Sequence, residues 1–299
     1  AVCGARASGP ALPRQPRDQD WDELLAAQPE TCEPETMNAE DPLFILYTSG
    51  STGRPKGVLH TTGGYLVYAS LTHETVFDLR DDDVYWNVAD PGWAYGLYYA
   101  VVGPLLLGHA TIFYEGAFSV ESTYRILAQH RVTSLAAAPT VYRLLLAAGE
   151  EPARAIRGQL RTASSAGEPL NPEVIRWFEQ HIGCSIQDHY GQTELGIVVG
   201  NSSAFRYERH PGSMGLPLPG FRVVLLGDAF GELGPGTVGQ VAVDRTRSPL
   251  YWFMGYWRQE TTSCYHGAYY LTGDTAELAA DGSFTFVGRA DDLITSAGY

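Results

Sequence analysis

The chain is short of positive charge and of long apolar runs, and both shortages limit what it can bind. Lysine and arginine total 20 against 34 aspartates and glutamates, so the 299 residues carry a formal charge of −14. This sign of charge does not suit nonspecific nucleic-acid binding, which needs a basic surface. No apolar stretch approaches the roughly 20 residues that a membrane span needs. We therefore expect no nucleic-acid partner and no membrane span.

Cysteine is scarce as well, and its spacing carries no pattern. The four cysteines, Cys3, Cys32, Cys184 and Cys264, are widely scattered, which indicates neither a metal site nor a disulfide framework. Scattered reduced cysteines are typical of a cytoplasmic protein, and that is the expected location. The first residues show neither a starting methionine nor a signal pattern. We therefore expect an internal piece of a longer protein.

What the chain does contain is an alternation typical of α/β proteins. It is 44 % hydrophobic and 18 % charged, which suits a folded globular protein. Apolar runs alternate with amphipathic segments, and this predicts a mostly parallel sheet flanked by helices. The expected strands are 43–47, 84–88, 110–114, 133–137, 161–165 and 184–189. The expected helices are 21–27, 61–73, 94–107, 120–130, 140–148 and 171–181.

After about residue 213 the pattern changes. Closely spaced glycines separate short apolar runs such as 221–226 and 240–243, which is typical of an antiparallel β subdomain with tight turns. The predicted fold class is therefore α/β followed by a smaller antiparallel β subdomain. The expected divisions are a linker or remnant over 1–40, an α/β subdomain over 41–212, a β-rich subdomain over 213–288, and a tail over 289–299.

The most informative stretch is residues 47–57, Tyr-Thr-Ser-Gly-Ser-Thr-Gly-Arg-Pro-Lys-Gly. It follows the run 43–47, which we interpret as a buried strand. Glycines let a backbone approach a ligand closely, and hydroxyls and N–H groups can surround phosphate oxygens. This is not the phosphate loop of the common NTPases, because Pro55 precedes Lys56 and Gly57 follows it. Pro55 also disfavours a direct passage into a helix. A generic run of this composition is more often a solvated turn.

Four further polar segments stand near the ends of predicted strands or in the β-rich part. Residues 188–194, Asp-His-Tyr-Gly-Gln-Thr-Glu, offer a carboxylate for a metal, a hydroxyl for a phosphate and an aromatic face for a base. Taken alone, this segment and the others would be ordinary loops. The other three are Ala-Gly-Glu-Pro at 166–169, Tyr-Leu-Thr-Gly-Asp at 270–274 and Gly-Arg-Ala-Asp-Asp at 288–292.

Together, in this order and spacing, the five segments resemble those of the adenylate-forming enzymes: acyl-CoA synthetases, luciferases and peptide-synthetase adenylation domains. The resemblance covers about residues 40–299 and is nearest to acetyl-CoA and medium-chain acyl-CoA synthetases. It implies that a carboxylic acid attacks the α-phosphate of ATP to give an acyl-adenylate, and that coenzyme A then displaces AMP. It also implies ATP, Mg²⁺ and coenzyme A as cofactors. The attacking carboxylate is already ionised, so the first step needs no general base.

The resemblance assigns roles to individual residues. Lys56 would lie near the leaving pyrophosphate, Thr193 would contact the α-phosphate, and Glu194 would hold Mg²⁺. Tyr190 would pack on the adenine, while Asp274 would accept hydrogen bonds from both ribose hydroxyls. No imidazole is needed for catalysis. The expected ATP and AMP contacts are Thr48, Ser49, Gly50, Ser51, Thr52, Gly53, Gly167, Glu168, Pro169, Asp188, His189, Tyr190, Gln192, Thr193, Asp274 and Arg289. Asp291 matches the hinge to a C-terminal domain, and Gly298 would lie near coenzyme A.

The expected acyl pocket is formed by Trp93, Ala94, Tyr95, Ala166 and Gly191. The alternative is that Trp93 and Tyr95 are core aromatics, and Trp93 could be both. Tyr95 also stands where acetyl-CoA synthetases carry a smaller residue, so the pocket could be reshaped and not simply deeper. Acetyl-CoA synthetases have tryptophan where this chain has Gly191 and valine where it has Ala166, and both changes open space. We therefore expect an acid larger than acetate, aliphatic or small aromatic, and a Gly191→Trp substitution that shifts preference to acetate or propionate.

The chain stops before the C-terminal domain that carries a catalytic lysine in these relatives, so impaired turnover is expected of it alone. Two alternatives stay open. One is a ligase that loads the phosphopantetheine of a carrier protein. The other is a non-catalytic, truncated adenylate-binding chain.

Overall fold

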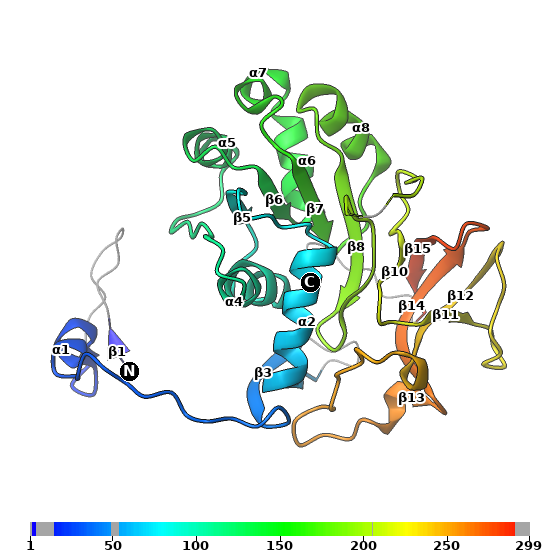
Figure 1. Ribbon diagram of the computed structural model, residues 1–299, viewed down its shortest axis with the longest axis horizontal. Helices are drawn as coiled ribbons and strands as arrows, with labels where there is room; N and C mark the ends of the chain where they lie inside the picture. The colour runs from blue at the N-terminus through cyan, green and yellow to red at the C-terminus, as the bar shows by residue number, and fades with distance from the viewer. Residues whose placement is uncertain (1, 4–14, 49–53, 205, 291–299) are drawn as a thin grey trace. The chain divides into compact units, whose positions relative to one another are not determined.

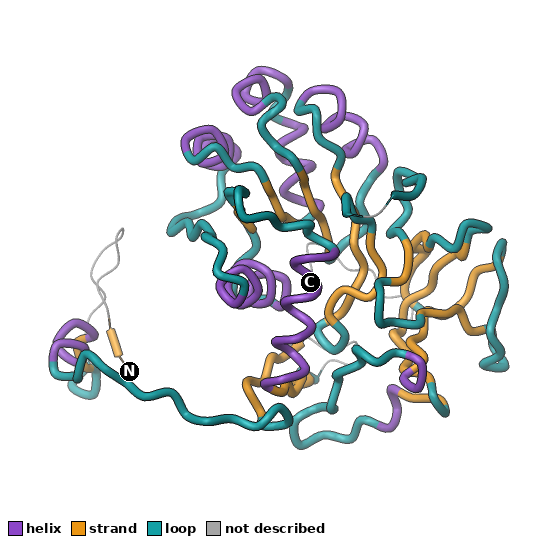
Figure 2. The backbone as a smooth tube through the Cα atoms, in the orientation of Figure 1, coloured by secondary structure: helices purple, strands orange, loops and turns teal. Residues whose placement is uncertain are grey.

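The computed structural model describes residues 2–3, 15–48, 54–204 and 206–290, which Figures 1 and 2 trace. The chain divides into two units, Ala1–Met37 with Tyr114–Ala117, and Asn38–Phe113 with Phe118–Tyr299. In the first unit β1 (Val2–Cys3) pairs with β2 (Gln19–Asp20), and α1 (Trp21–Ala26) follows. The Asp20 carboxylate accepts the N–H groups of Asp22 and Glu23 and so caps α1. The short helix expected over 21–27 is confirmed.

The second unit contains a six-stranded sheet in the order β10-β9-β8-β7-β6-β5. Four strands run parallel and lie side by side in chain order: β5 (Tyr85–Asn87), β6 (Ser134–Ala137), β7 (Thr162–Ala166) and β8 (Ile186–Gln192). Two antiparallel strands follow, β9 (Gly196–Gly200) and β10 (Leu216–Pro217). The predicted mostly parallel sheet is confirmed.

Helices cover both faces of this sheet (Figure 1). One side carries α5 (Val120–Gln129), α6 (Pro139–Ala147), α7 (Glu150–Ala153) and α8 (Pro172–His181), and the other carries α2 (Thr62–Thr75) and α4 (Gly103–Leu106). Successive side chains of a strand enter opposite cores. Tyr85 therefore packs in the cluster with α2, and Trp86 in the cluster with α5 and α8.

The helix expected over 94–107 is continuous but wound in three ways. It consists of α3 (Ala94–Gly96), the π-helix η1 (Leu97–Val102) and α4. The wide turns of η1 place the neighbouring tyrosines Tyr98 and Tyr99 both in the core, at 1 % and 2 % exposure. π-Helical turns occur often at functional sites.

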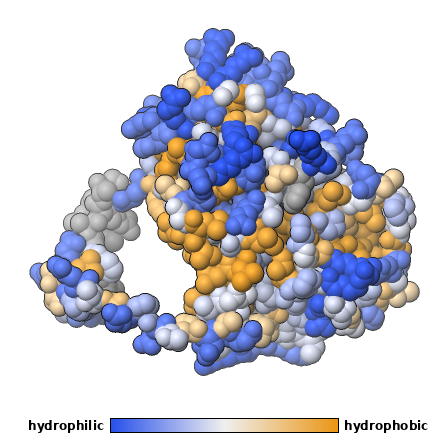
Figure 3. Space-filling view, viewed as in Figure 1, coloured by the Kyte–Doolittle hydropathy of each residue, from blue (hydrophilic) through white to orange (hydrophobic). Residues whose placement is uncertain are grey.

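On the face shown in Figure 3, apolar side chains gather over α2 and α4, where Val67, Leu105 and Leu106 are exposed.

One strand prediction is wrong, and a second is right about the strand but wrong about its burial. Residues 110–114 form no strand: Thr111 makes one isolated bridge to Tyr85, because the three-residue β5 offers so little edge. The run 43–47 is not buried, since Leu43 and Tyr47 are 41 % and 59 % exposed. It belongs to β3 (Pro42–Thr48), which pairs within the described chain only with β4 (Lys56–Thr61). The main sheet therefore does not cover it.

The predicted antiparallel β subdomain is present as a second sheet. Its strands are β11 (Val223–Leu226), β12 (Thr237–Asp244), β13 (Tyr265–His266), β14 (Tyr269–Leu278) and β15 (Phe284–Arg289), all paired antiparallel. Three 3-10 turns complete the described elements: η2 (Arg154–Ile156), η3 (Arg245–Arg247) and η4 (Thr262–Cys264). The division at residue 212 stays a prediction, and β10, beyond it, extends the main sheet.

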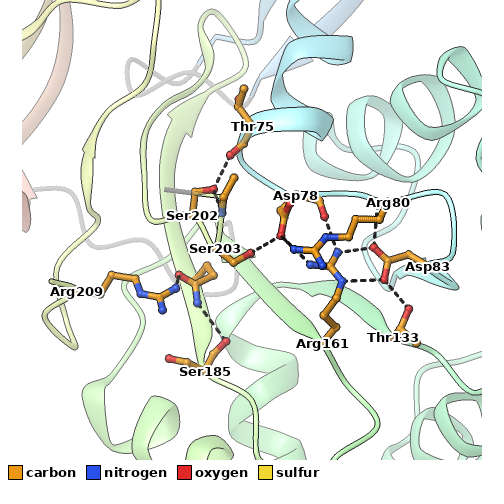
Figure 4. Close-up of polar contacts among 12 residues, drawn as sticks. Thr75, Asp78, Arg80, Asp83, Thr133, Arg161, Ser185, Ser202, Ser203 and Arg209 are labelled. Atoms are coloured by element: carbon orange, nitrogen blue, oxygen red, sulfur yellow. Dashed lines mark hydrogen bonds and ion pairs between the residues drawn. The ribbon is translucent and has the colours of Figure 1, made fainter. Parts of the chain in front are cut away.

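An ion-pair network ties the loop after α2 to the beginnings of β6 and β7 (Figure 4). The Arg161 guanidinium pairs with Asp83 and, at 2.7 Å, with Asp78. Thr133 donates its hydroxyl to Asp83 at 2.7 Å. The network therefore fixes the amino-terminal ends of the parallel strands β6 and β7.

None of the helices described here is both long and apolar enough to cross a membrane.

Candidate active site

A cavity of about 490 Å³ lies at the carboxyl ends of the parallel strands. Open α/β sheets bind their ligands at this edge. The lining includes all five residues predicted for the acyl pocket, Trp93, Ala94, Tyr95, Ala166 and Gly191. It also includes four predicted nucleotide contacts, Gly167, Glu168, Gln192 and Thr193. The structure thus brings together residues from the ends of β7 and β8 and from the segments that follow β5, β7 and β8, and their roles stay predictions.

Asp274, on β14, is the centre of a hydrogen-bond cluster at the rim of β8. Its Oδ2 accepts from the Tyr190 hydroxyl at 2.6 Å and from Gln192 Nε2 at 2.8 Å, and its Oδ1 accepts from Arg289 at 3.0 Å. Burial and the neighbouring Asp274 carboxylate raise the pKa of Tyr190 well above its ordinary value, so its hydroxyl stays a donor. A carboxylate has about four lone-pair sites, and three are filled here. A ribose that donates both hydroxyls would have to displace one protein donor.

A tyrosine of η1 holds the backbone of Thr193. Tyr98 donates its hydroxyl to the Thr193 carbonyl at 3.0 Å. The same hydroxyl contacts Nε2 of His60, at the end of β4. Burial lowers the pKa of His60 to about 4, so this imidazole is neutral at pH 7. The cluster fixes the backbone of the residue whose side chain we expect at the α-phosphate.

Glu194 and Lys56 meet at one tyrosine. The Tyr256 hydroxyl donates to Glu194 Oε1 at 2.7 Å, and Lys56 Nζ lies 5.1 Å from the centroid of the Tyr256 ring. Trp252 Nε1 donates to the Leu195 carbonyl at 3.1 Å and holds the next peptide. These two hydrogen bonds hold the Glu194 carboxylate and the Leu195 carbonyl in the loop after β8.

The described residues contain no group of three or more His, Cys, Asp or Glu that could hold a metal ion. This does not conflict with the predicted role of Glu194, because Mg²⁺ in nucleotide sites is held by one or two carboxylates together with substrate phosphates. Among the residues in view, none donates a hydrogen bond to Glu194 Oε2. The carboxylate therefore suits an ion that arrives with a nucleotide.

The predicted phosphate loop joins the two strands of a hairpin. Thr48 and Lys56 stand opposite each other in β3 and β4, and the Thr48 hydroxyl donates to the Lys56 carbonyl at 3.5 Å. The loop leads into β4, so the expectation from Pro55 that no helix follows directly is confirmed. The predicted contacts Ser49, Gly50, Ser51, Thr52 and Gly53, the hinge Asp291 and Gly298 lie outside the described residues.

Several predicted nucleotide residues do not line the cavity. Asp188 and His189 are buried, at 4 % and 3 % exposure, and neither they nor Pro169 and Tyr190 are among its lining residues. Burial raises the pKa of Asp188 well above its ordinary value and lowers that of His189 to about 3. His189 Nε2 lies 3.0 Å from the Asn201 carbonyl. The imidazole is therefore a neutral core group.

Glu168 lines the cavity, but its carboxylate is occupied. It accepts from Arg143 at 2.7 Å and from the Thr140 hydroxyl at 2.9 Å. Both donors lie on α6, so the pair anchors the loop after β7 to that helix. The predicted contact of Glu168 with the nucleotide stays a prediction.

The interpretation of Gly191 needs a correction. A Cβ atom at this position would stand 2.0 Å from the Gly196 carbonyl oxygen, because β9 approaches β8 closely where the register shifts. A tryptophan here would displace the β8–β9 backbone and not merely fill the cavity. Gly191→Trp is therefore not a clean test of substrate size.

The buried hydroxyl of Tyr95 is a feature that the sequence does not indicate. Its ring lines the cavity, but its hydroxyl is buried and, within the described chain, has no hydrogen-bond partner. Tyr98, Trp252 and Tyr256 were missed altogether. They are ordinary aromatics in apolar segments, and no local pattern distinguishes them from core residues.

The chain belongs to the AMP-binding enzyme family, whose model matches residues 6–257. The fold and the gathered residues agree with this assignment, and the resemblance inferred from the sequence is confirmed. An acetyl-coenzyme A synthetase of Xanthomonas campestris pv. campestris (strain 8004) is 43 % identical over 311 residues, which cover all of this chain and 48 % of that protein.

Two solved structures are similar throughout. A Brucella canis acyl-CoA synthetase is 50 % identical with a TM-score of 0.88, and the match covers 98 % of this chain and 53 % of that one. The anthranilate CoA ligase AuaEII, in complex with anthranoyl-AMP, is 26 % identical with a TM-score of 0.85, covering 100 % and 56 %. The chain thus spans about half the length of these relatives.

Proposed function

We propose that the protein containing this chain uses ATP to convert a carboxylic acid to an acyl-adenylate and then transfers the acyl group to coenzyme A. The observation that carries the proposal is the meeting of Lys56, Glu194 and the Thr193 loop beside a cavity at the strand ends. The relatives named above, an acetyl-coenzyme A synthetase and an acyl-CoA synthetase, support the reaction class.

The chemical difficulty is to bring a carboxylate anion to the polyanionic nucleotide. Lys56 supplies positive charge for the departing pyrophosphate, and Thr193 supplies a hydroxyl donor for the α-phosphate. One preorganised donor of this kind contributes about 3 kcal/mol to transition-state stabilisation. Mg²⁺, when bound with the nucleotide at Glu194, would neutralise phosphate charge.

We propose further that the acid is larger than acetate, either aliphatic or small aromatic. The cavity of about 490 Å³ is lined mainly by small and aromatic residues, among them Ala166, Trp93 and Tyr95. Each buried methylene of an acyl chain contributes about 0.8 kcal/mol. A relative named as an anthranilate CoA ligase carries an aromatic acid in the same fold.

The two alternatives differ from this proposal in the thiol that accepts the acyl group and in whether the protein turns over its substrates. Neither of the synthetases named above is described as loading a carrier protein, so coenzyme A is the preferred thiol. A non-catalytic role would require that the longer protein bind acyl-adenylates but release no pyrophosphate when it is given ATP and the acid. The cytoplasmic location stays a prediction.

The experiment is calorimetric binding of acyl-sulfamoyl adenosines, from acetyl to decanoyl and benzoyl, to the 299-residue chain. These compounds mimic the acyl-adenylate, and sulfamoyl adenosine without an acyl group is the matched control. Affinity should rise to an optimum beyond acetyl. Tightest binding of the acetyl compound would refute the size proposal, and no binding by a folded chain would refute the site.

A further inference from the structure

The segment 255–259 lies along β4 and holds the base of the predicted phosphate loop. The Leu59 N–H donates to the Gly255 carbonyl at 3.1 Å, and the Trp257 N–H donates to the Gly57 carbonyl at 2.7 Å. Between these two bonds, Tyr256 forms an antiparallel bridge with Val58. The position of Tyr256 relative to the loop is therefore set by backbone pairing.

Local contacts also fix the backbone at Tyr256. Its N–H donates to the Thr261 hydroxyl at 3.1 Å. Gly255 before it has φ of +129°, and a Cβ there would stand 2.9 Å from the same hydroxyl oxygen. Only glycine fits this conformation without strain. The turn thus fixes the backbone from which the tyrosine projects, and the residue is 8 % exposed.

The side chain contacts two groups of opposite charge at different points. Its hydroxyl donates to Glu194, and its ring lies under the Lys56 ammonium. No ion pair joins Lys56 to Glu194 in the described part of the chain. One tyrosine therefore contacts both charged side chains, each at a different part of its own side chain.

We propose that Tyr256 is a positioning residue that holds Lys56 and Glu194 apart, so that both charges stay available to a nucleotide and its metal ion. The hydroxyl orients the carboxylate, and the ring supports the amine. This inference rests on the proposed function, because it assigns Lys56 and Glu194 to the nucleotide.

The first test needs no nucleotide. Lys56 is the only lysine of the chain, so protein labelled with ¹³C at the lysine ε-carbon gives a single NMR signal. The ring current of Tyr256 should displace that signal. Tyr256→Phe should retain the displacement, because it keeps the ring, and Tyr256→Leu should abolish it. An unchanged signal in Tyr256→Leu would overturn the ring contact and with it the proposal.

The second test measures ATP binding by calorimetry with and without Mg²⁺. Tyr256→Phe should weaken the Mg²⁺-dependent part of ATP binding by about fivefold or more, since a hydrogen bond to a charged group is lost. ATP binding in chelator should be unchanged. Tyr256→Leu should weaken both, because Lys56 loses its support and can pair with Glu194.

Tyr269→Phe is the matched control. Tyr269 also donates to a glutamate, Glu232, at 2.6 Å, but away from the cavity. The Tyr269→Phe variant should leave ATP binding unchanged at every Mg²⁺ concentration. Equal Mg²⁺ dependence in Tyr256→Phe and the unaltered chain would overturn this inference alone. No ATP binding by the folded, unaltered chain would overturn the proposed function and the inference together.

Discussion

Replacing Asp274 with alanine should destabilise the fold as well as the site. Asp274 is 5 % exposed and accepts hydrogen bonds from Tyr190, Gln192 and Arg289. Truncation removes the Asp274 acceptor from all three donors and the Asp274 charge from beside Arg289, while Gln192 Nε2 keeps its bond to the Thr272 carbonyl at 2.8 Å. Breaking a buried pair costs about 3–5 kcal/mol.

The lower end of that range is expected here, about 3 kcal/mol. The Arg289 side chain is 24 % exposed, and Gln192 is half-buried, so water can replace the acceptor for both. Tyr190 is 8 % exposed, so its hydroxyl has no such replacement. Asp274→Asn keeps one acceptor oxygen and should cost about half as much.

The assay is urea unfolding followed by the fluorescence of the six tryptophans. The free energy of unfolding should fall while the m-value stays constant, as for a change confined to the native state. Glu151→Ala is the control, because its ion pair with Arg154 at 2.8 Å is exposed on both sides. Such surface pairs contribute little. An Asp274→Ala variant no less stable than Glu151→Ala would refute the reasoning.

Two further outcomes are expected. Gly191→Ala should lower the free energy of unfolding by about 1–3 kcal/mol, because its Cβ would overlap the Gly196 carbonyl; unchanged urea stability would contradict the close approach of β9. Burial raises the pKa of Asp83, but hydrogen bonds from Arg161 and Thr133 outweigh this and hold it below its usual range. The stability that this pKa shift contributes is present above the unfolded-state pKa of about 3.9 and is lost at lower pH. Arg161→Met should flatten the pH dependence of unfolding below about pH 4, and an identical slope in both proteins would refute this.

The parallel strands and their helices could be predicted because their signals are local. Residues 133–137 and 161–165 are short runs buried on both faces, and Asn171 with Pro172 marks the beginning of α8. The strand β4 was missed because Lys56 and His60 interrupt its apolar pattern. The run 110–114 has the composition of a strand but almost no partner edge.

Two of the five segments, 166–169 and 188–194, contribute residues to the cavity lining, because each lies at the carboxyl end of a parallel strand. The residues that orient the loop after β8 could not be found in this way. Tyr98 lies 95 residues from its partner Thr193, and Tyr256 lies 62 residues from Glu194. Only the folded chain brings these pairs together. Likewise, the close approach of β9 to Gly191 depends on a register shift that no composition indicates.

The order of the strands has a consequence for how the molecule forms during synthesis. β5, β6, β7 and β8 are neighbours both in the chain and in the sheet, so each can add to a sheet already begun as the ribosome releases it. The hydrogen-bond partners that fix Gln192, Glu194 and Leu195 emerge only with residues 252–274. Loop-closing contacts of such range form late. A nascent chain that ends before residue 250 would therefore hold the sheet while its loop after β8 still samples many conformations.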